Sequence, residues 1–268
     1  MDFTSLLYQA YSDACIKTKI IKTQIVCIEP IIPLSNEQQN QLLEGDGQKN
    51  KNEYKQINSS TGLAVNYYKI LEDTGNIEKL RFEEKVEKPL KIKGGRKANL
   101  DVAYKREEKL YYIESKFLEP YYSGNEHNTE SYFKKEYYDV PDNDKDAWCE
   151  LLVDAQKYKV YNFSQICRHL MAIWRKHKNN EEIVFQSVMW KMTDKFINTI
   201  VDKEGQEFLR ERILEIEHEA KSCYQRINEF LEQIGWDKLT FQSLYYNDIV
   251  EELSSSKYYS EFKKRYFL

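Results

Sequence analysis

Residues 94–120 read GGRKANLDVAYKREEKLYYIESKFLEP, and they place charged side chains inside what otherwise looks like buried strand. Two alternating runs, at about 98–105 and 109–118, predict two antiparallel strands. A tight turn at Glu107 and Glu108 would join them. This hairpin sets the geometry of the region that carries the chemistry.

The register of the hairpin brings three charged groups together. Paired positions sum to 215, so Asp101 faces Glu114 across the ladder, with the two Cβ atoms roughly 5 Å apart. The two-residue period of a strand puts Lys116 on the same face and turns Ser115 away. We therefore expect two carboxylates and one ammonium to converge.

Two carboxylates held this close repel each other and raise each other's pKa, a cost that a purely structural hairpin has no reason to carry. A divalent cation removes the conflict. Mg²⁺ accepts a pair of carboxylate oxygens, with waters and a substrate phosphate in the remaining positions. Mn²⁺ suits the same oxygen ligands, whereas zinc prefers imidazole or thiolate partners.

The other interpretation is an exposed hairpin with Lys116 in a surface ion pair. Apolar neighbours such as Val102, Tyr112, Ile113 and Phe117 favour a covered hairpin instead. Geometry alone leaves both interpretations open.

Composition predicts one folded domain over residues 1–268, with 41% hydrophobic and 14% aromatic residues. Residues 1–57 form an N-terminal helical extension in this interpretation, and about 121–144 form an insert. The N-terminus lacks an apolar segment of signal length, and no later window approaches a membrane span. The five cysteines are scattered without paired spacing, so we expect reduced thiols, a cytoplasmic protein and no membrane partner.

Periodicity predicts an α/β fold, with helices on the faces of a sheet. The expected helices cover about 2–19, 35–43, 59–73, 145–159, 162–177 and 204–231, with a closing helix at the end. The expected strands cover about 77–87, 98–105, 109–118, 183–192 and 239–246. Polar residues 44–58 are expected to form a loop.

An Asp on one strand followed by Glu-x-Lys on the next resembles the PD-(D/E)XK nuclease superfamily. Here NLD at 99–101 retains only the Asp of the family's Pro-Asp pair, whereas ESK at 114–116 fits as it stands. The segments SSTGLAVNYY, GGRKANLDV, IESKFLEPY and QICRHLM are together similar to a group of bacterial restriction endonucleases of this superfamily. The resemblance covers about residues 58–250.

This resemblance implies a restriction-endonuclease-like mixed central sheet flanked by helices. It also implies Mg²⁺-dependent hydrolysis of DNA phosphodiester bonds, with Mn²⁺ as a substitute. Asp101, Glu114 and Lys116 would form the catalytic core, and the two carboxylates would be the metal ligands. The alternatives are a repair or structure-selective nuclease, or a non-catalytic DNA-binding or interaction subunit with a nuclease-like fold.

Further candidates flank this core. Some superfamily members carry a glutamine on a later helix, and Gln165 could play that part, with Arg168 touching phosphate; a solvated helix flank is the alternative for both. Asn66 could neighbour the site from the preceding helix, although a structural hydrogen-bonding role is the commoner fate of such a residue. Glu72, Glu83 and Glu84 are further acidic options.

The net charge of -4 gives no global attraction to DNA, so a local basic patch must meet it. Residues 85–97 are such a patch, and the cations proposed to contact phosphate are Lys91, Lys93, Arg96 and Lys97. A homodimer would suit double-strand cutting, and a partner methyltransferase or another defence-system component would suit a restriction enzyme.

Overall fold

The computed structural model describes residues 7, 10, 11, 28–44, 53–56, 58–200 and 203–267. Within them one five-stranded sheet has the strand order β1-β2-β3-β4-β5. Its strands are β1 (Glu78–Lys85), β2 (Asn99–Arg106), β3 (Lys109–Lys116), β4 (Ile183–Met189) and β5 (Leu239–Tyr245). All five lie where the sequence predicts strands, and the predicted α/β fold is confirmed.

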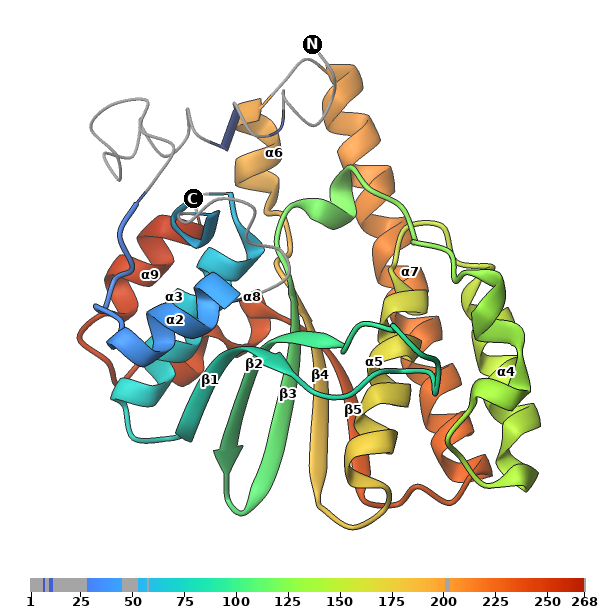
Figure 1. The fold of residues 1–268 in the computed structure, drawn as a ribbon. Helices are drawn as coiled ribbons and strands as arrows, with labels where there is room; N and C mark the ends of the chain where they lie inside the picture. Colours follow the sequence, from blue (N-terminus) through green and yellow to red (C-terminus); the bar gives the residue numbers. More distant parts are fainter. Residues whose placement is uncertain are drawn as a thin grey trace.

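The sheet is mixed. The first three strands pair antiparallel, whereas β3, β4 and β5 pair parallel. Every residue of β4 is buried, as expected for a parallel strand covered by helices on both faces. Figure 1 shows the strands side by side between two groups of helices.

The β2–β3 hairpin has the predicted register. Val102 lies opposite Ile113, so Asp101 and Glu114 are the next pair along. Glu107 and Glu108 form the turn with φ values of 50° and 63°, the left-handed conformation that a two-residue type I′ turn requires at both positions.

One helical group contains α3 (Ser60–Asp73), α8 (Tyr246–Ile249) and α9 (Tyr259–Tyr266). The Ser59 hydroxyl caps α3 by accepting from the Gly62 amide at 3.1 Å. Tyr67 of α3 packs its ring edge-on against Tyr246, and the Ser115 hydroxyl, on this face of β3, lies 2.9 Å from the Tyr246 hydroxyl.

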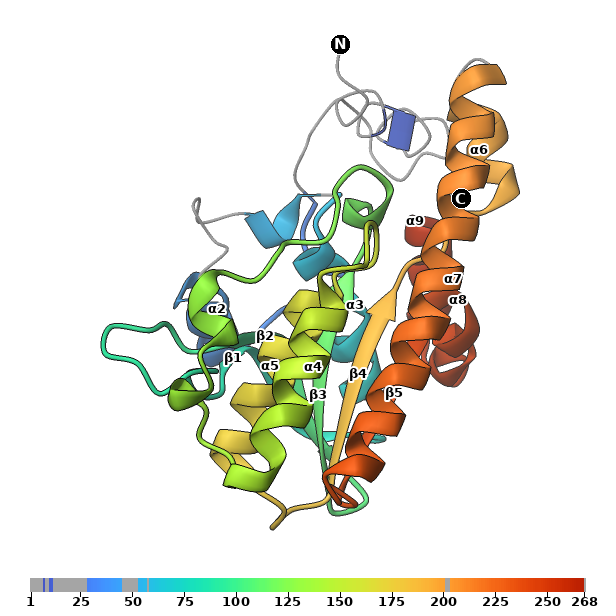
Figure 2. The ribbon, with the colours of Figure 1, turned by 90° about the vertical axis from the view of Figure 1, so that its right-hand side faces the viewer.

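The second group contains α4 (Lys145–Ala155), α5 (Phe163–His177) and α7 (Lys203–Gln233). The predicted core stripe of α5 is buried: Phe163, Ile166, Leu170 and Ile173. His177 near the end of α5 contacts the Tyr112 hydroxyl of β3 at 2.8 Å, so α5 lies across the sheet face opposite α3 (Figure 2).

Three smaller regions complete the described structure. Helix α2 (Asn36–Glu44) starts with a reciprocal cap, in which Ser35 and Gln38 each accept from the other's backbone amide. Helix α6 (Asp194–Ile200) was not among the predicted helices, because it is too short for a periodic signal. The short 3-10 helices are η1 (Glu53–Lys55), η2 (Glu119–Tyr121), η3 (Glu130–Phe133), η4 (Lys135–Tyr137), η5 (Asp142–Asp144) and η6 (Val250–Leu253).

The expected helix at 2–19 and the expected loop at 44–58 fall largely outside the described residues. Among the helices that are described, none is both long enough and apolar enough to cross a membrane.

The hairpin turn offers a direct test of the fold. Changing Glu107→Asn together with Glu108→Gly should raise the free energy of unfolding by about 1 kcal/mol, because Asn and Gly tolerate positive φ better than Glu. Urea denaturation measures the change. Glu211→Gly, at an exposed position inside α7, is the matched control and should lower stability by about the same amount. A destabilised double variant would contradict the turn geometry.

Candidate active site

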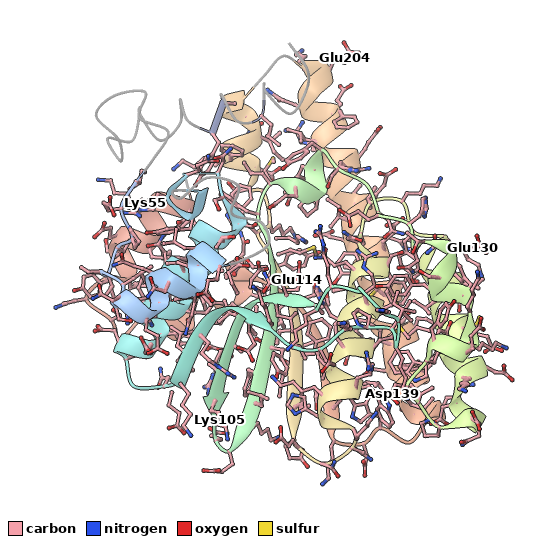
Figure 3. All side chains as sticks on the ribbon, viewed as in Figure 1. Lys55, Lys105, Glu114, Glu130, Asp139 and Glu204 are labelled. Atoms are coloured by element: carbon pink, nitrogen blue, oxygen red, sulfur yellow. The ribbon has the colours of Figure 1, made fainter. Side chains whose placement is uncertain are left out.

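A row of polar side chains crosses the buried sheet at one level. Glu114 on β3 pairs with Ser187 on β4, and Asp101 on β2 is the next position after Val102 in the hairpin ladder. On the other side Phe82 and Glu84 pair with Val102 and Leu100, so Glu83 of β1 lies level with Asp101. Figure 3 labels Glu114 near the middle of the view.

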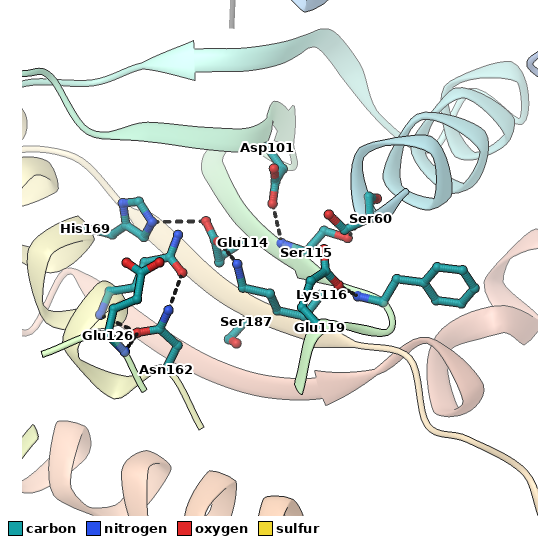
Figure 4. A network of polar contacts seen from close by, with 12 residues as sticks. Ser60, Asp101, Glu114, Ser115, Lys116, Glu119, Glu126, Asn162, His169 and Ser187 are labelled. Carbon is teal, nitrogen blue, oxygen red and sulfur yellow. Dashed lines mark hydrogen bonds and ion pairs between the residues drawn. The ribbon is translucent and has the colours of Figure 1, made fainter. Parts of the chain in front are cut away.

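Glu114 is the centre of this row and only 3% exposed. Its Oε1 lies 2.7 Å from Lys116 Nζ, and its Oε2 lies 3.0 Å from His169 Nε2 (Figure 4). The contact with His169 lacks hydrogen-bond geometry, and neither ring nitrogen has a hydrogen-bond partner among the described residues. We therefore treat that contact as electrostatic. Both Glu114 oxygens thus face a nitrogen.

Asp101 is less well compensated. Its Oδ2 accepts a hydrogen bond from the Ser115 amide at 2.6 Å. Burial and the neighbouring carboxylates of Glu114 and Glu83 raise the pKa of Asp101 well above its usual range, and the lowering effects of Lys116 and the Ser115 amide do not offset them. The carboxylate pair carries the electrostatic conflict that the sequence predicts.

The other two charges are stabilised in their ionised forms. Burial alone would raise the pKa of Glu114, but Lys116 and His169 outweigh it and lower that pKa to about 2. Burial alone would lower the pKa of Lys116, but Glu114, Glu119 and Asp101 raise it above its ordinary value. Glu114 is therefore a carboxylate and Lys116 an ammonium at neutral pH.

Glu83 adds a third acid, which the sequence analysis named only as one option among several. Its φ of 52° lies in the left-handed region, which is uncommon for a residue other than glycine. The Asn99 side-chain amide donates to its carboxylate. This arrangement keeps a buried acid beside Asp101 and adds to its electrostatic conflict.

Helix α5 contributes two residues to the site. His169 is 5% exposed and contacts Glu114, although the sequence analysis did not choose it as a site residue. Its position four residues after Gln165, on the same helical face, was the available signal. Gln165 lines the same pocket as Glu114 and Lys116, so the structure brings this candidate to the same cavity as two of the three core residues.

Two other candidates have partners elsewhere. The guanidinium of Arg168 contacts Glu126 and Asn128 of the insert at 3.1 Å each. The Asn66 amide donates to the Gly62 carbonyl and to the Tyr266 hydroxyl, and its oxygen accepts from the Ile31 amide. These bonds tie together the helical layer on the opposite face, the structural role weighed for Asn66 above.

The basic stretch forms the long loop between β1 and β2. Its backbone is anchored by Arg175 of α5, which donates to the carbonyls of Lys88 and Leu90. The four candidate cations are all exposed: Lys91, Lys93, Arg96 and Lys97. Lys91 lies 3.9 Å from the Asp139 carboxylate, and Lys97 is near enough to Glu87 to interact with it electrostatically.

The donor set at the site fits a hard cation. Asp101 and Glu114 supply carboxylate oxygens and are in electrostatic conflict, which a divalent cation would relieve. Among the described residues, no group of three or more His, Cys, Asp or Glu side chains is arranged to hold a metal ion. A cation here would thus be bound by two carboxylates, with water and substrate oxygens as its other ligands.

Protein-family models were compared with the chain. The model described as Restriction Endonuclease associating with ARP matches residues 17–267, which include all five strands and both helical groups. The searches of curated proteins and of solved structures gave no match.

The conflict at Asp101 predicts an unusual response to mutation. A carboxyl whose folded pKa is raised opposes folding once the pH exceeds its unfolded value of 3.8. Asp101→Asn should therefore stabilise the protein by about 1 kcal/mol at pH 7 in the presence of a chelator. The gain should shrink as the pH falls toward 3.8. Urea denaturation between pH 3.5 and pH 7 measures it, with Asp237→Asn on the surface as the control, and a loss of stability at pH 7 would contradict the prediction.

Proposed function

The chain belongs to the family of restriction endonucleases associating with ARP, and from this premise we propose that it is a Mg²⁺-dependent DNA endonuclease of the PD-(D/E)XK type. The observation that supports this proposal is the pairing of half-buried Asp101 with buried Glu114 on adjacent strands, with the Lys116 ammonium 2.7 Å from Glu114. A binding module would have no use for this conflict, whereas a cation-dependent hydrolase depends on it.

Asp101 and Glu114 would hold the cation, and Mn²⁺ could replace Mg²⁺ because both accept oxygen ligands. When bound, the cation would neutralise charge on the scissile phosphate and lower the pKa of a water molecule. The pocket wall formed by Glu114 and Lys116 gives the substrate access to both residues.

Lys116 acts as a cation in this proposal. Burial would lower its pKa, but Glu114, Glu119 and Asp101 outweigh burial and raise that pKa, which favours the ammonium form in the metal-free protein. Its ammonium can orient the attacking water and stabilise the negative charge that develops on the phosphate. His169 lies 3.0 Å from the second oxygen of Glu114 and so occupies the space beside that carboxylate.

DNA would meet the basic loop before it reaches the carboxylates. This loop leads directly into the strand that carries Asp101, and its cations can contact phosphates on either side of the scissile bond. The family description adds an association with ARP, so we propose that the chain works beside a protein partner.

Metal binding should depend on Asp101. Wild-type protein should bind Mn²⁺ or Mg²⁺ in isothermal titration calorimetry, and Asp101→Asn should bind at least about 10-fold more weakly because one carboxylate ligand is removed. A chelator should abolish DNA cleavage. Asp237→Asn, far along the chain and outside the sheet, should bind the cations normally. Equal affinity in Asp101→Asn and wild type would exclude Asp101 as a ligand.

Lys116→Ala should separate cleavage from binding. The rate of DNA cleavage in Mg²⁺ should fall by at least about 10²-fold, because the ammonium acts mainly on charge that develops in the transition state. DNA affinity in Ca²⁺ should change little. Lys221→Ala, at an exposed position on α7, is the control. Cleavage by Lys116→Ala at the wild-type rate would favour the binding-module alternative.

The basic loop should affect DNA binding, in contrast to Lys116. The variant neutralises four residues of the loop together: Lys91, Lys93, Arg96 and Lys97. DNA affinity should fall, and the slope of log affinity against log salt should flatten by about 0.9 for each phosphate that the loop no longer neutralises. Fluorescence anisotropy in Ca²⁺ at several salt concentrations measures both quantities. A control variant neutralises four other lysines outside the loop: Lys203, Lys221, Lys257 and Lys264. An unchanged slope in the loop variant would exclude the loop from the DNA interface.

A further inference from the structure

A pocket of about 330 Å³ opens beside Glu114 and Lys116. Its volume falls within the range of about 300–1,000 Å³ that is typical of small-molecule sites. The turn after β3, the end of β4 and the start of α5 form its walls. The pocket therefore adjoins the carboxylate pair, sharing Glu114 with it but not Asp101.

The charge of the pocket disfavours an anion. Its lining includes the carboxylates of Glu114, Glu119 and Glu126 against the single ammonium of Lys116. Glu126 is paired at 3.1 Å with Arg168, which lies outside the lining. A phosphate group would be repelled from the deeper part of such a pocket, whereas a neutral group would not.

Apolar side chains form much of the pocket wall. Pro120 and Tyr122 come from the segment after β3. Val160 comes from the segment before α5, Ile166 from α5 itself, and Met189 from the end of β4. Two hydroxyl groups of the lining, those of Tyr161 and Ser187, already bond to each other, because Tyr161 donates to Ser187 at 2.8 Å. An occupant of the pocket therefore need not supply hydrogen-bond partners to these two hydroxyl groups.

Two hydrogen-bonding groups remain for the edge of an occupant. Asn162 donates to Gln165 Oε1 at 3.0 Å, which orients the glutamine while no described residue uses its Nε2. Glu119 Oε2 accepts from the Phe117 amide at 2.8 Å, and no described residue uses its Oε1. One fixed donor and one fixed acceptor thus line the same pocket.

We propose that this pocket receives one nucleobase of the DNA, unpaired or turned out of the helix, next to the scissile phosphate. A base is neutral and planar, and its edge carries both acceptors and donors, which Gln165 and Glu119 can meet. The inference rests on the proposed nuclease function. It specifies the substrate as DNA in which a nucleotide at the cleavage position is unpaired or can be extruded.

The test begins with the cleavage position itself. Plasmid DNA is digested by the full chain in Mg²⁺ or Mn²⁺, and the ends are sequenced. Duplexes that carry 2-aminopurine at each nucleotide flanking the cut are then bound in Ca²⁺. The fluorescence of one of these probes should rise several-fold on binding, because the base leaves the stack. A mismatch at that nucleotide should speed single-turnover cleavage at least about 10-fold. The mismatched base is already unpaired, so turning it out of the helix costs less free energy.

Gln165→Leu removes the amide donor at nearly constant volume and should abolish the fluorescence rise. DNA affinity should stay within about threefold of wild type, because the phosphate contacts are unchanged. Gln225→Leu, at an exposed position on α7, is the matched control and should keep the full rise.

The outcomes separate this inference from the nuclease proposal. One outcome would overturn the proposed base pocket and leave the nuclease proposal standing. In it, the protein cleaves at a defined position, but 2-aminopurine fluorescence rises at no flanking nucleotide and the mismatch does not change the cleavage rate. A full fluorescence rise with Gln165→Leu would overturn the assignment of Gln165. Absence of any cleavage by the wild-type protein would overturn the nuclease proposal and the pocket with it.

Discussion

The repulsion between two carboxylates on adjacent strands, buried Glu114 and half-buried Asp101, is the constraint around which this structure is organised. Asp101 and Glu114 cannot both be ionised in a covered sheet without compensation, because burial and mutual repulsion both disfavour the charged forms. The chain stabilises one of them fully. Lys116 and His169 contact the two oxygens of Glu114, while Asp101 keeps a pKa well above its usual range. Asp101 is therefore the carboxyl group whose ionised form a bound cation would stabilise.

The surrounding elements hold that arrangement in place. Ser115, between the two charged residues of β3, points to the opposite face, where its hydroxyl meets Tyr246 and the Ser60 carbonyl. Its backbone amide meanwhile donates to Asp101. A single strand therefore fixes the acid pair on one face and anchors the helical layer on the other, so a shift in register would disrupt both.

Residues far from the strands complete the site. Helix α5 supplies His169, and the N-terminal cap of that helix, Asn162, orients Gln165 at the pocket. Arg168 on the same helix fastens the insert through Glu126 and Asn128. In the proposed function, one helix thus orients a ligand carboxylate, a substrate-contacting amide and the segment that forms part of the pocket.

The sequence by itself determined the hairpin, its register and the convergence of Asp101, Glu114 and Lys116, because strand alternation and turn length are local properties. It also indicated the mixed α/β fold. Only the tertiary structure decided that His169 contacts Glu114, that Glu83 lies level with Asp101, and that Asn66 ties Tyr266 to α3. These contacts join residues that are far apart in the chain, from 18 residues for Glu83 and Asp101 to 200 residues for Asn66 and Tyr266. Periodicity cannot report such contacts, because they depend on how separate elements pack.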